Sequence, residues 1–575
     1  MAKVPSHAEQ QRARMQVKQV STHFTNQSER LRNNWLRFYK LYRFFERGKR
    51  EGGANLVIPK AFEVVEDVAS RITAHDPQFL PVPKRDLPGQ MEDIIRQYME
   101  FVWDEQDLKQ RVRSIAKNML IYGTAFAKVR WDVNEMISFR SEGEGEDEVE
   151  IKEAEIVREM PTFDVVDIFD LMVDPTEENI QRGMAVIQKR DFVHISELDD
   201  KLYFNLDQLR VEELDSKDVS ESQKETKFQH RGIQTDEIPE DLRFNLKEYW
   251  GLFSPTGDPE DEREYIITTI MDDSVVIRME ENELGFRPFV DFHDSRVPGE
   301  FYSVGEIEPI ESLILENEAV RNQRMDVVNR HLNGKYIISP DANINPTDLA
   351  QWVKGKALAL PIHADDISLL ESKNPIASSY TEESAILRDI QTITGTINVG
   401  QESGRGSFTN TATGERIRAA IQSARYNYKI ENLEDSLAEL GEMMIKLSAE
   451  NIEGTEPIRL ANDDGTFEFV EIDESIFRIA ANAFHMKIEA GSTGASTAAE
   501  RRNDALAFGN VSAAYAGLGV PIDMTAVFKE IAKQFNKVNL DELLTPGQVA
   551  LPQGAVSPQA APNPAQELVP EELLV

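Results

Sequence analysis

The sequence predicts an α+β protein of several domains, in which short strands accompany unusually long helices. Within residues 123–293, several short stretches alternate apolar and polar side chains, as half-buried strands do. Residues 305–450 instead show the three-to-four-residue apolar spacing of helices, broken by an insert and a glycine-rich loop. The chain has 575 residues, which is enough for two to four domains with large cores.

The charge balance is the one extreme feature of the composition. The chain carries 101 acidic and 63 basic residues, a formal net charge of −38. This excludes a general DNA or membrane binder, because phosphate binding needs dense Lys and Arg. The absence of cysteine excludes disulfides and thiolate sites and fits assembly in a reducing cytoplasm. We find no signal peptide and no long apolar run, so we expect a soluble protein with no membrane partner.

The N-terminal part is expected to be helical. Residues 1–30 are polar and weakly patterned, which indicates a helical or disordered arm. Aromatic and basic residues interleave over residues 33–53, which fits either a helix with an aromatic core face or a nucleic-acid stacking surface. Helices are predicted over residues 61–73, 90–105 and 108–122, and an extended segment over residues 77–83.

A strand-rich region follows. Residues 123–132 form the first predicted strand, with residues 137–140 and 150–157 as its partners around an acidic turn. That acidic run lacks the spacing of a calcium loop and indicates a solvated hairpin tip. A helix is predicted over residues 195–209. Residues 163–175 are predicted as a strand and a turn. Further strands are predicted over residues 184–190, 244–252, 264–271, 274–280, 288–293, 467–473 and 484–489.

Three long helices dominate the centre of the chain. The first is expected from residue 305 to Asn333-Gly334, about 40 Å. The second is expected over residues 380–399, with a capping box at residues 379–382. Its buried stripe is Ile386, Ile390, Ile393 and Ile397. The third, over residues 413–450 and about 55 Å long, has a stripe that includes Tyr428 and Leu433.

No motif of a known catalytic site is present. The chain has no GxxxxGK[ST] loop, no GxGxxG after a strand, no HExxH and no GxSxG. His293 stands beside Asp291 and Asp294 and could be a metal or acid–base site, although lone histidines near carboxylates are usually structural. We therefore expect a protein that is not an enzyme, with no catalytic residue, metal or cofactor. A carboxylate-dependent hydrolase stays open as an alternative.

Four segments carry a family resemblance. They are residues 122–131 (YGTAFAKVRW), 169–175 (FDLMVDP), 301–306 (FYSVGE) running into 310–324 (IESLILENEAVRNQR), and 412–418 (ATGERIR). With these segments in this order, the chain resembles phage portal proteins, the head-to-tail connector rings of tailed bacteriophages. The resemblance covers about residues 35–510. A different ring-forming virion or tail protein is the alternative within the same class.

The resemblance implies a domain organisation. It divides the chain into an N-terminal arm (1–30), a mixed wing domain (31–303), a first stem helix (304–333), a small α/β clip (334–378), a second stem helix (379–399), a tunnel loop (400–412), a long helix with the second part of the wing (413–494), a helical crown (495–545) and a disordered tail (546–575). Within the clip, residues 335–339 and 357–362 are expected as strands and residues 347–354 as a helix.

The resemblance also implies a function. Portal proteins are rings of twelve subunits at a capsid vertex, through which double-stranded DNA is packaged and ejected. The implied partners are further copies of the chain, the DNA, the terminase packaging motor and head-completion or adaptor proteins at the clip, and capsid and scaffold proteins. The implied location is the virion, after assembly in the bacterial host cytoplasm. Twelve copies carry 12 × (−38) = −456 formal charges, and an acidic bore would keep DNA from adhering.

Candidate contact residues lie in the stem, clip and tunnel loop. Cations gather near the end of the first stem helix and in the clip: Arg321, Arg324, Arg330, Lys335, Lys354 and Lys356. They fit a ring of phosphate contacts or, equally, a helix-dipole and subunit-bridging role. The tunnel loop is predicted to touch DNA, or to be a plain linker. It comprises Gly400, Gln401, Glu402, Ser403, Gly404, Arg405, Gly406, Ser407, Phe408, Thr409, Asn410 and Thr411. The isoleucine stripe is expected to pack on the other stem helix or on a neighbouring subunit.

Overall fold

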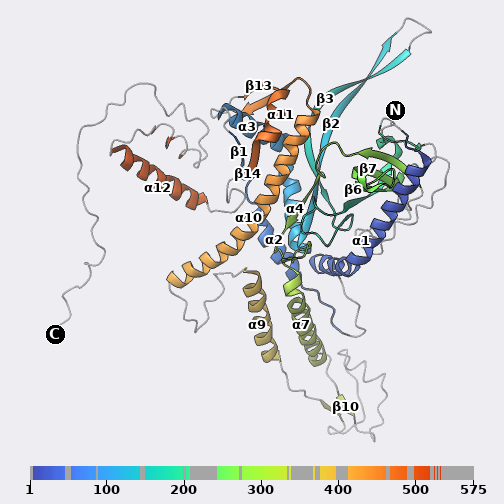
Figure 1. The fold of residues 1–575 in the computed structure, drawn as a ribbon. Coiled ribbons are helices and arrows are strands. Elements are labelled where there is room, and N and C mark those ends of the chain that lie inside the picture. Colours follow the sequence, from blue (N-terminus) through green and yellow to red (C-terminus); the bar gives the residue numbers. More distant parts are fainter. Residues whose placement is uncertain are drawn as a thin grey trace. The chain divides into compact units, whose positions relative to one another are not determined.

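The structure is a computed structural model (Figure 1). It describes residues 4–45, 53–85, 89–142, 149–198, 202–206, 243–270, 275–332, 336–338, 367–369, 376–395, 412–461, 467–488 and 498–517, with Met524, Val527, Phe528 and Ile531. The chain divides into two compact units. The first comprises Met1–Leu460 and Phe469–Ser496, and the second comprises Ala461–Glu468 and Thr497–Val575.

The chain opens with one long helix, α1 (His7–Tyr42), capped by Ser6 and Glu9 in a capping box. It crosses the expected boundary between arm and wing because its apolar stripe continues without a break. Val17 and Phe24 join the core of a five-stranded sheet, while Trp35 and Phe38 are buried in the main core. Within α1, the aromatic segment is therefore a core-facing helix face rather than a nucleic-acid stacking surface.

The next three helices and the extended segment agree with prediction. They are α2 (Lys60–Ile72), β1 (Phe79–Pro83), α3 (Gly89–Glu105) and α4 (Leu108–Tyr122). Gly123 ends α4 in a conformation with φ of 87°, which few residues other than glycine adopt.

A three-stranded sheet has the order β3-β2-β9, from β2 (Thr124–Glu142), β3 (Val149–Val166) and β9 (Phe289–His293). The prediction of residues 137–140 as a separate partner strand is wrong, because they continue β2 past a bulge at Asn134/Glu135. β9 pairs only with the first part of β2, from Thr124 to Lys128. Within the described residues, β2 and β3 therefore extend beyond β9 as a two-stranded ribbon (Figure 1).

A five-stranded antiparallel sheet has the order β4-β5-β6-β7-β8. Its strands are β4 (Leu171–Val173), β5 (Ala185–His194), β6 (Arg243–Phe253), β7 (Arg263–Ile270) and β8 (Val276–Glu281). The helix predicted over residues 195–209 is wrong for the described part of that range: Ile195–Glu197 form a 3-10 turn and residues 203–205 are not helical. Phe204 instead buries its side chain and donates its backbone N–H to Ile277 O at 2.8 Å, which holds the segment against the sheet.

Three long helices follow, with bounds that differ from prediction at three ends. A 3-10 turn (Glu308–Ile310) containing Pro309 precedes α7 (Glu311–Leu332), so the first helix starts later than residue 305. α9 (Ile376–Thr394) starts directly after Pro375, a helix-start signal, which makes the predicted capping box at residues 379–382 wrong. Its predicted end at residue 399 is also wrong, because Gly395, with φ of 73°, follows the last helical residue, Thr394. α10 (Ala412–Asn451) agrees with prediction.

Between α7 and α9, β10 (Tyr336–Ile338) pairs with β11 (Ile367–Leu369). The first of these strands was predicted and the second was not. The predicted clip helix at residues 347–354 and strand at 357–362 lie outside the described residues, as does the tunnel loop apart from the first residue of α10.

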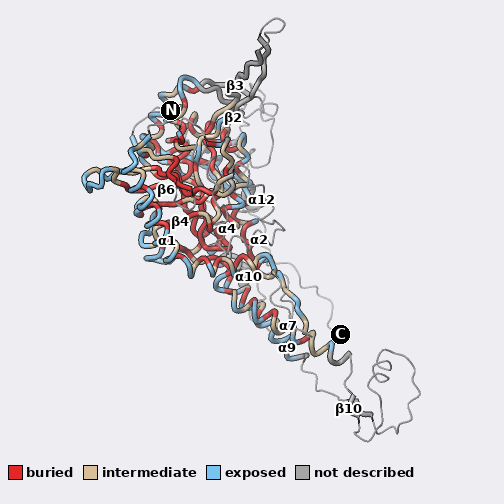
Figure 2. Tube along the Cα trace, turned by 90° about the vertical axis from the view of Figure 1, so that its right-hand side faces the viewer, coloured by how far each residue is buried: buried red, intermediate tan, exposed pale blue. Residues whose placement is uncertain are grey.

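The remaining elements are β12 (Thr455–Ala461), β13 (Phe467–Asp473), α11 (Glu474–Ala483), β14 (Phe484–Ile488) and α12 (Ala498–Gly517). β14 pairs with β1, which joins distant parts of the chain. The second half of α10 lies in the main core, where Leu437, Leu440 and Met444 are fully buried, and Figure 2 shows the concentration of buried residues there. Among the described helices, none is both long and apolar enough to cross a lipid bilayer.

Candidate functional site

An ion-pair cluster joins α7 and α9, the two helices predicted as stem helices. Glu383 of α9 accepts from Arg324 Nη2 at 2.6 Å and from Arg321 Nη1 at 3.0 Å, both on α7. The Arg324 guanidinium also lies 4.1 Å from the centre of the Tyr380 ring. Burial would raise the pKa of Glu383, but the bonds from Arg324 and Arg321 outweigh it and lower the pKa.

The two arginines of this cluster differ in solvent exposure. The Arg324 side chain is 5% exposed, whereas that of Arg321 is 46% exposed. Arg324 Nη1 is buried and has no hydrogen-bond partner among the described residues. Arg330 lies in the last turns of α7. The other predicted channel cations, Lys335, Lys354 and Lys356, lie outside the described residues.

The predicted isoleucine stripe of α9 is only partly covered by its own chain. Ile386 and Ile390 are buried in the main core, whereas Ile393 is 44% exposed. Ile397 lies outside the described residues. Within the described residues, the stripe is therefore buried at Ile386 and Ile390 and exposed at Ile393.

An extended segment between α1 and α2 is bonded to the side of α7. Asn322 of α7 accepts from Leu56 N at 2.7 Å and donates to Leu56 O at 3.0 Å. One turn further along, Asp326 accepts from Ala54 N at 2.6 Å. Since these bonds use backbone groups of the segment, they fix its path along the helix whatever side chains it carries.

A buried polar junction connects α10 to the segment that leads from β9 into the stem. Lys429 of α10 donates to the Asp294 carboxylate and lies 2.6 Å from Glu306 Oε1. All three residues are buried. Two more residues on this face of α10 bind the same region, since Asn432 donates to Asp294 O and Ser436 to Asp291 O, each at 2.8 Å.

The turn from α4 to β2 packs tightly against this junction. Asp294 N donates to Gly123 O at 3.0 Å, and Glu306 N donates to Leu120 O at 2.8 Å. A Cβ atom on Gly123 would lie 1.8 Å from Ser303 O, and one on Gly305 would lie 2.7 Å from Gly123 N. Only glycines allow this backbone approach, so the start of the stem is held with little freedom.

His293 belongs to the junction as a structural residue. It is buried, with Nε2 2.5 Å from Asp291 Oδ2 and Nδ1 2.8 Å from Ser303 Oγ. Both ring nitrogens are thus used within the fold, which supports the structural interpretation over the acid–base one. No group of residues suited to a metal ion is found in the described part of the chain.

Two carboxyl groups here have strongly shifted pKa values. Burial, opposed by Lys429 and assisted by Glu306, raises the pKa of Asp294 to about 7. Burial, assisted by Asp291 and Glu442, raises the pKa of Glu439 to about 7. Asp294 Oδ2 is buried and has no hydrogen-bond partner within the described residues. The raised pKa values favour the neutral forms of Asp294 and Glu439, so burial limits the negative charge at the junction.

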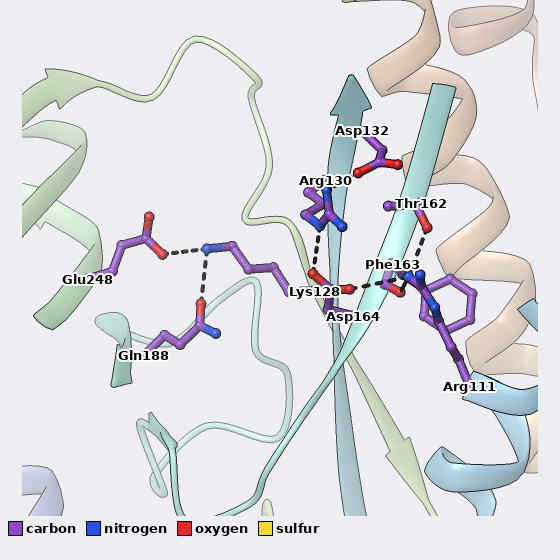
Figure 3. Close-up of polar contacts among 9 residues, drawn as sticks. All are labelled: Arg111, Lys128, Arg130, Asp132, Thr162, Phe163, Asp164, Gln188 and Glu248. Atoms are coloured by element: carbon purple, nitrogen blue, oxygen red, sulfur yellow. Dashed lines mark hydrogen bonds and ion pairs between the residues drawn. The ribbon is translucent and has the colours of Figure 1, made fainter. Parts of the chain in front are cut away.

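A separate polar network fixes the two sheets of the wing (Figure 3). Lys128 of β2 donates to Gln188 of β5 at 2.9 Å and to Glu248 of β6. Burial would raise the pKa of Glu248, but Lys128 lowers it to about 2 with help from nearby arginines. On β3, Asp164 accepts from Arg130 at 2.6 Å and from Arg111 at 3.2 Å.

The end of α9 is capped by α10. Arg425 donates from Nη1 to Thr392 O at 2.9 Å and to Ile393 O at 3.2 Å, and so satisfies carbonyl groups that a helix end leaves unpaired. The last turn of α9, which ends six residues before the predicted start of the tunnel loop at residue 400, is thereby attached to Arg425 of α10.

Sequence reasoning missed Glu383, Arg425, Asp294, Glu306 and Lys429 as positioning residues. One signal was available for Lys429: it lies three residues after Tyr426 and four before Leu433, both buried, which places a lysine on the core side of α10. Its partners lie more than a hundred residues earlier, and no local pattern connects them.

The sequence model of one family, described as the phage SU10 portal protein, matches residues 132–568. This span is more than half of the chain and includes α7, α9, α10 and α12. A comparison with curated proteins gave no match. The paired helices, the long helix joined to both and the family match all agree with the resemblance drawn from the sequence. The chain therefore belongs to the phage SU10 portal protein family, a family of tailed-phage portal proteins.

Proposed function

We propose that twelve copies of this chain form a ring at a capsid vertex and that double-stranded DNA passes through the ring during packaging and ejection. The observation that carries the proposal is the family match across residues 132–568, which spans every predicted channel element. The family is structural rather than catalytic, in agreement with the missing catalytic motifs.

The stem hairpin of α7 and α9 is proposed as the channel wall. Arg321 is the better candidate for a phosphate contact, because its side chain is half exposed while that of Arg324 is buried against Glu383 and Tyr380. Arg330, Lys335, Lys354 and Lys356 stay proposed contacts. Residues 400–412, with Arg405, are proposed as the tunnel loop that follows the moving duplex, because Gly, Ser and Thr give permissive backbone and neutral donors.

The other parts are proposed to serve the same ring. Residues 334–378 form the clip, where the terminase motor and later head-completion or adaptor proteins dock. The wing and the crown (495–545) contact capsid and scaffold proteins, and residues 546–575 form the tail of the chain. Assembly in the host cytoplasm agrees with a chain that contains no cysteine.

Native mass measurement and negative-stain imaging of the purified full chain test this function. We expect a ring of about twelve subunits with an axial hole wide enough for a DNA duplex. A ring without such a hole would support another virion ring protein, and a monomer with metal-dependent turnover would support a hydrolase. Either result would overturn the proposal.

A further inference from the structure

We propose that Asp294, Glu306 and Lys429 are positioning residues of the channel: together they set the angle of the stem against α10. This inference rests on the proposed function, because the angle matters only if stem and tunnel loop surround a duplex. It concerns buried residues that touch no DNA.

The first observation is that one turn of α10 holds both stem helices. Lys429 contacts Glu306, which lies just before α7, and Arg425 caps the last carbonyls of α9. These two residues are four apart, about 6 Å along the helix axis. A tilt of α10 at this turn would therefore move both stem helices together.

The second observation is that the contacts are directional. Lys429, Asn432 and Ser436 lie on one face of α10 and bind defined oxygen atoms of the segment after β9. On the other side, the Gly123–Ser303 approach leaves no space for that segment to shift. Apolar packing at the same place would permit α10 to slide or rotate, whereas this set of bonds specifies one register.

The third observation is the charge imbalance. Two buried carboxylates share one ammonium group, and Asp294 Oδ2 has no partner in the described part of the chain. Buried ion clusters of this kind contribute little net stability. Proteins in which neutral side chains of similar volume replace such a cluster are often equally stable. A cluster that adds little stability yet fixes a register is suited to a geometric role.

The groups that face Asp294 and its neighbours come from each packed element. The segment around β9 contributes Asp291, His293 and Arg296, and the segment before α7 contributes Glu306. From α10 come Lys429, Glu439, Glu442 and Lys446. Because the carboxyl groups outnumber the cations, protonation changes the net charge of the junction. The pH dependence of the melting temperature therefore reports on the cluster.

The test compares the wild-type chain with D294N/E306Q/K429M, in which the cluster is neutral but similar in size. We expect the triple variant to form rings and to melt within a few degrees of wild type. In rings imaged by cryo-electron microscopy, the angle between α7 and α10 should change. The amount of DNA protected from nuclease in heads assembled with the variant should fall at least tenfold.

Two further variants separate positioning from folding. K128M/E248Q neutralises a comparable buried pair in the wing and should leave the angle and the protected DNA unchanged. K429R, with both carboxylates present, should keep the wild-type angle and the wild-type amount of protected DNA, because arginine can donate to both carboxylates. The triple variant should also lose the pH dependence of melting that Asp294 gives the wild type.

Wild-type angle and wild-type DNA protection in the triple variant would overturn the inference. A tenfold loss in K128M/E248Q as well would also overturn it, since any wing defect would then suffice. If wild-type rings themselves failed to support DNA protection, the proposed function would fail first, and the angle measurement would still judge the positioning role.

Discussion

Arg324 of α7 lies 2.6 Å from Glu383 of α9, and this contact joins the two stem helices near their midpoints. Both side chains are largely buried, so the pair is desolvated, whereas the second arginine on Glu383 reaches solvent. Among the described residues, the Glu383 carboxylate therefore links α9 to two arginines of α7 within one chain.

Removing that carboxylate should loosen the hairpin. In Glu383→Ala, Arg324 would be left as a buried charge without its partner, which typically costs about 3–5 kcal/mol. We expect amide hydrogen exchange in α7 and α9 to report a local opening free energy lower by about 3 kcal/mol. Arg321→Ala is the control and should cost at most about 1 kcal/mol, because exposed ion pairs contribute little. Equal effects of the two variants would contradict the role assigned to Glu383.

The glycine at the end of α4 should tolerate no side chain. Gly123→Ala combines an unfavourable positive φ with a Cβ placed 1.8 Å from Ser303 O, so the start of the stem must move. Gly285→Ala is a matched control, because Gly285 also has positive φ but open space around its Cβ position. We expect Gly285→Ala to cost about 1 kcal/mol and Gly123→Ala to cost several times more, measured as melting temperature and soluble yield. Similar melting temperatures for the two variants would refute this difference.

Stability should fall as pH rises towards neutrality. Glu439 has a folded-state pKa of about 7 against an ordinary 4.5, and Asp294 about 7 against 3.8. Their protonated forms are favoured in the folded chain, so the stabilisation is complete below the ordinary pKa values and is lost as pH rises to about 7.

Glu439→Gln should remove its share of this slope, up to about 1.4 kcal/mol per pH unit, in unfolding measured from pH 4.5 to 7. Glu450→Gln changes an exposed carboxyl on the same helix and should leave the slope unchanged. An unaltered slope in Glu439→Gln would show that Glu439 titrates normally.

Deletion of residues 401–408 tests the tunnel loop. The expected result is intact rings with impaired DNA packaging or retention, because the deletion removes the proposed phosphate contact Arg405 without touching α9 or α10 as described. Ring formation is checked by native mass and retained DNA by nuclease protection. Wild-type packaging and retention in the deletion would favour a plain linker.

Strong local signals made much of the fold predictable. α3 and α4 have clear helical spacing, and Gly123 ends the second of them, so both were placed correctly. The start of α9 was misplaced because two start signals compete there, the proline at 375 and the capping box at residues 379–382. Tyr428 was assigned to the apolar stripe of α10, yet it is 49% exposed, because the packed face passes through Tyr426 and Ile430 instead.

The candidate site was less predictable for a physical reason. Clustered cations are visible in a sequence, but their partners are not, so Arg321 and Arg324 were treated alike although Glu383 buries only one of them. Similarly, Asp294 and Lys429 meet only because β9 packs along α10, a tertiary contact with no local signature. Motif spacing predicts elements, whereas the ion pairs that orient them depend on packing.

The cap on α9 has a consequence for the ends of the predicted tunnel loop. The last turn of α9, which precedes the loop, is bonded to Arg425 of α10. The loop ends at Ala412, the first residue of α10, which lies thirteen residues or about 20 Å before Arg425 along the helix. If α10 rotates about the turn that contains Arg425, Ala412 moves much further than the last turn of α9 does. A small rotation of α10 near Arg425 would then become a larger displacement of Ala412, where the predicted tunnel loop ends.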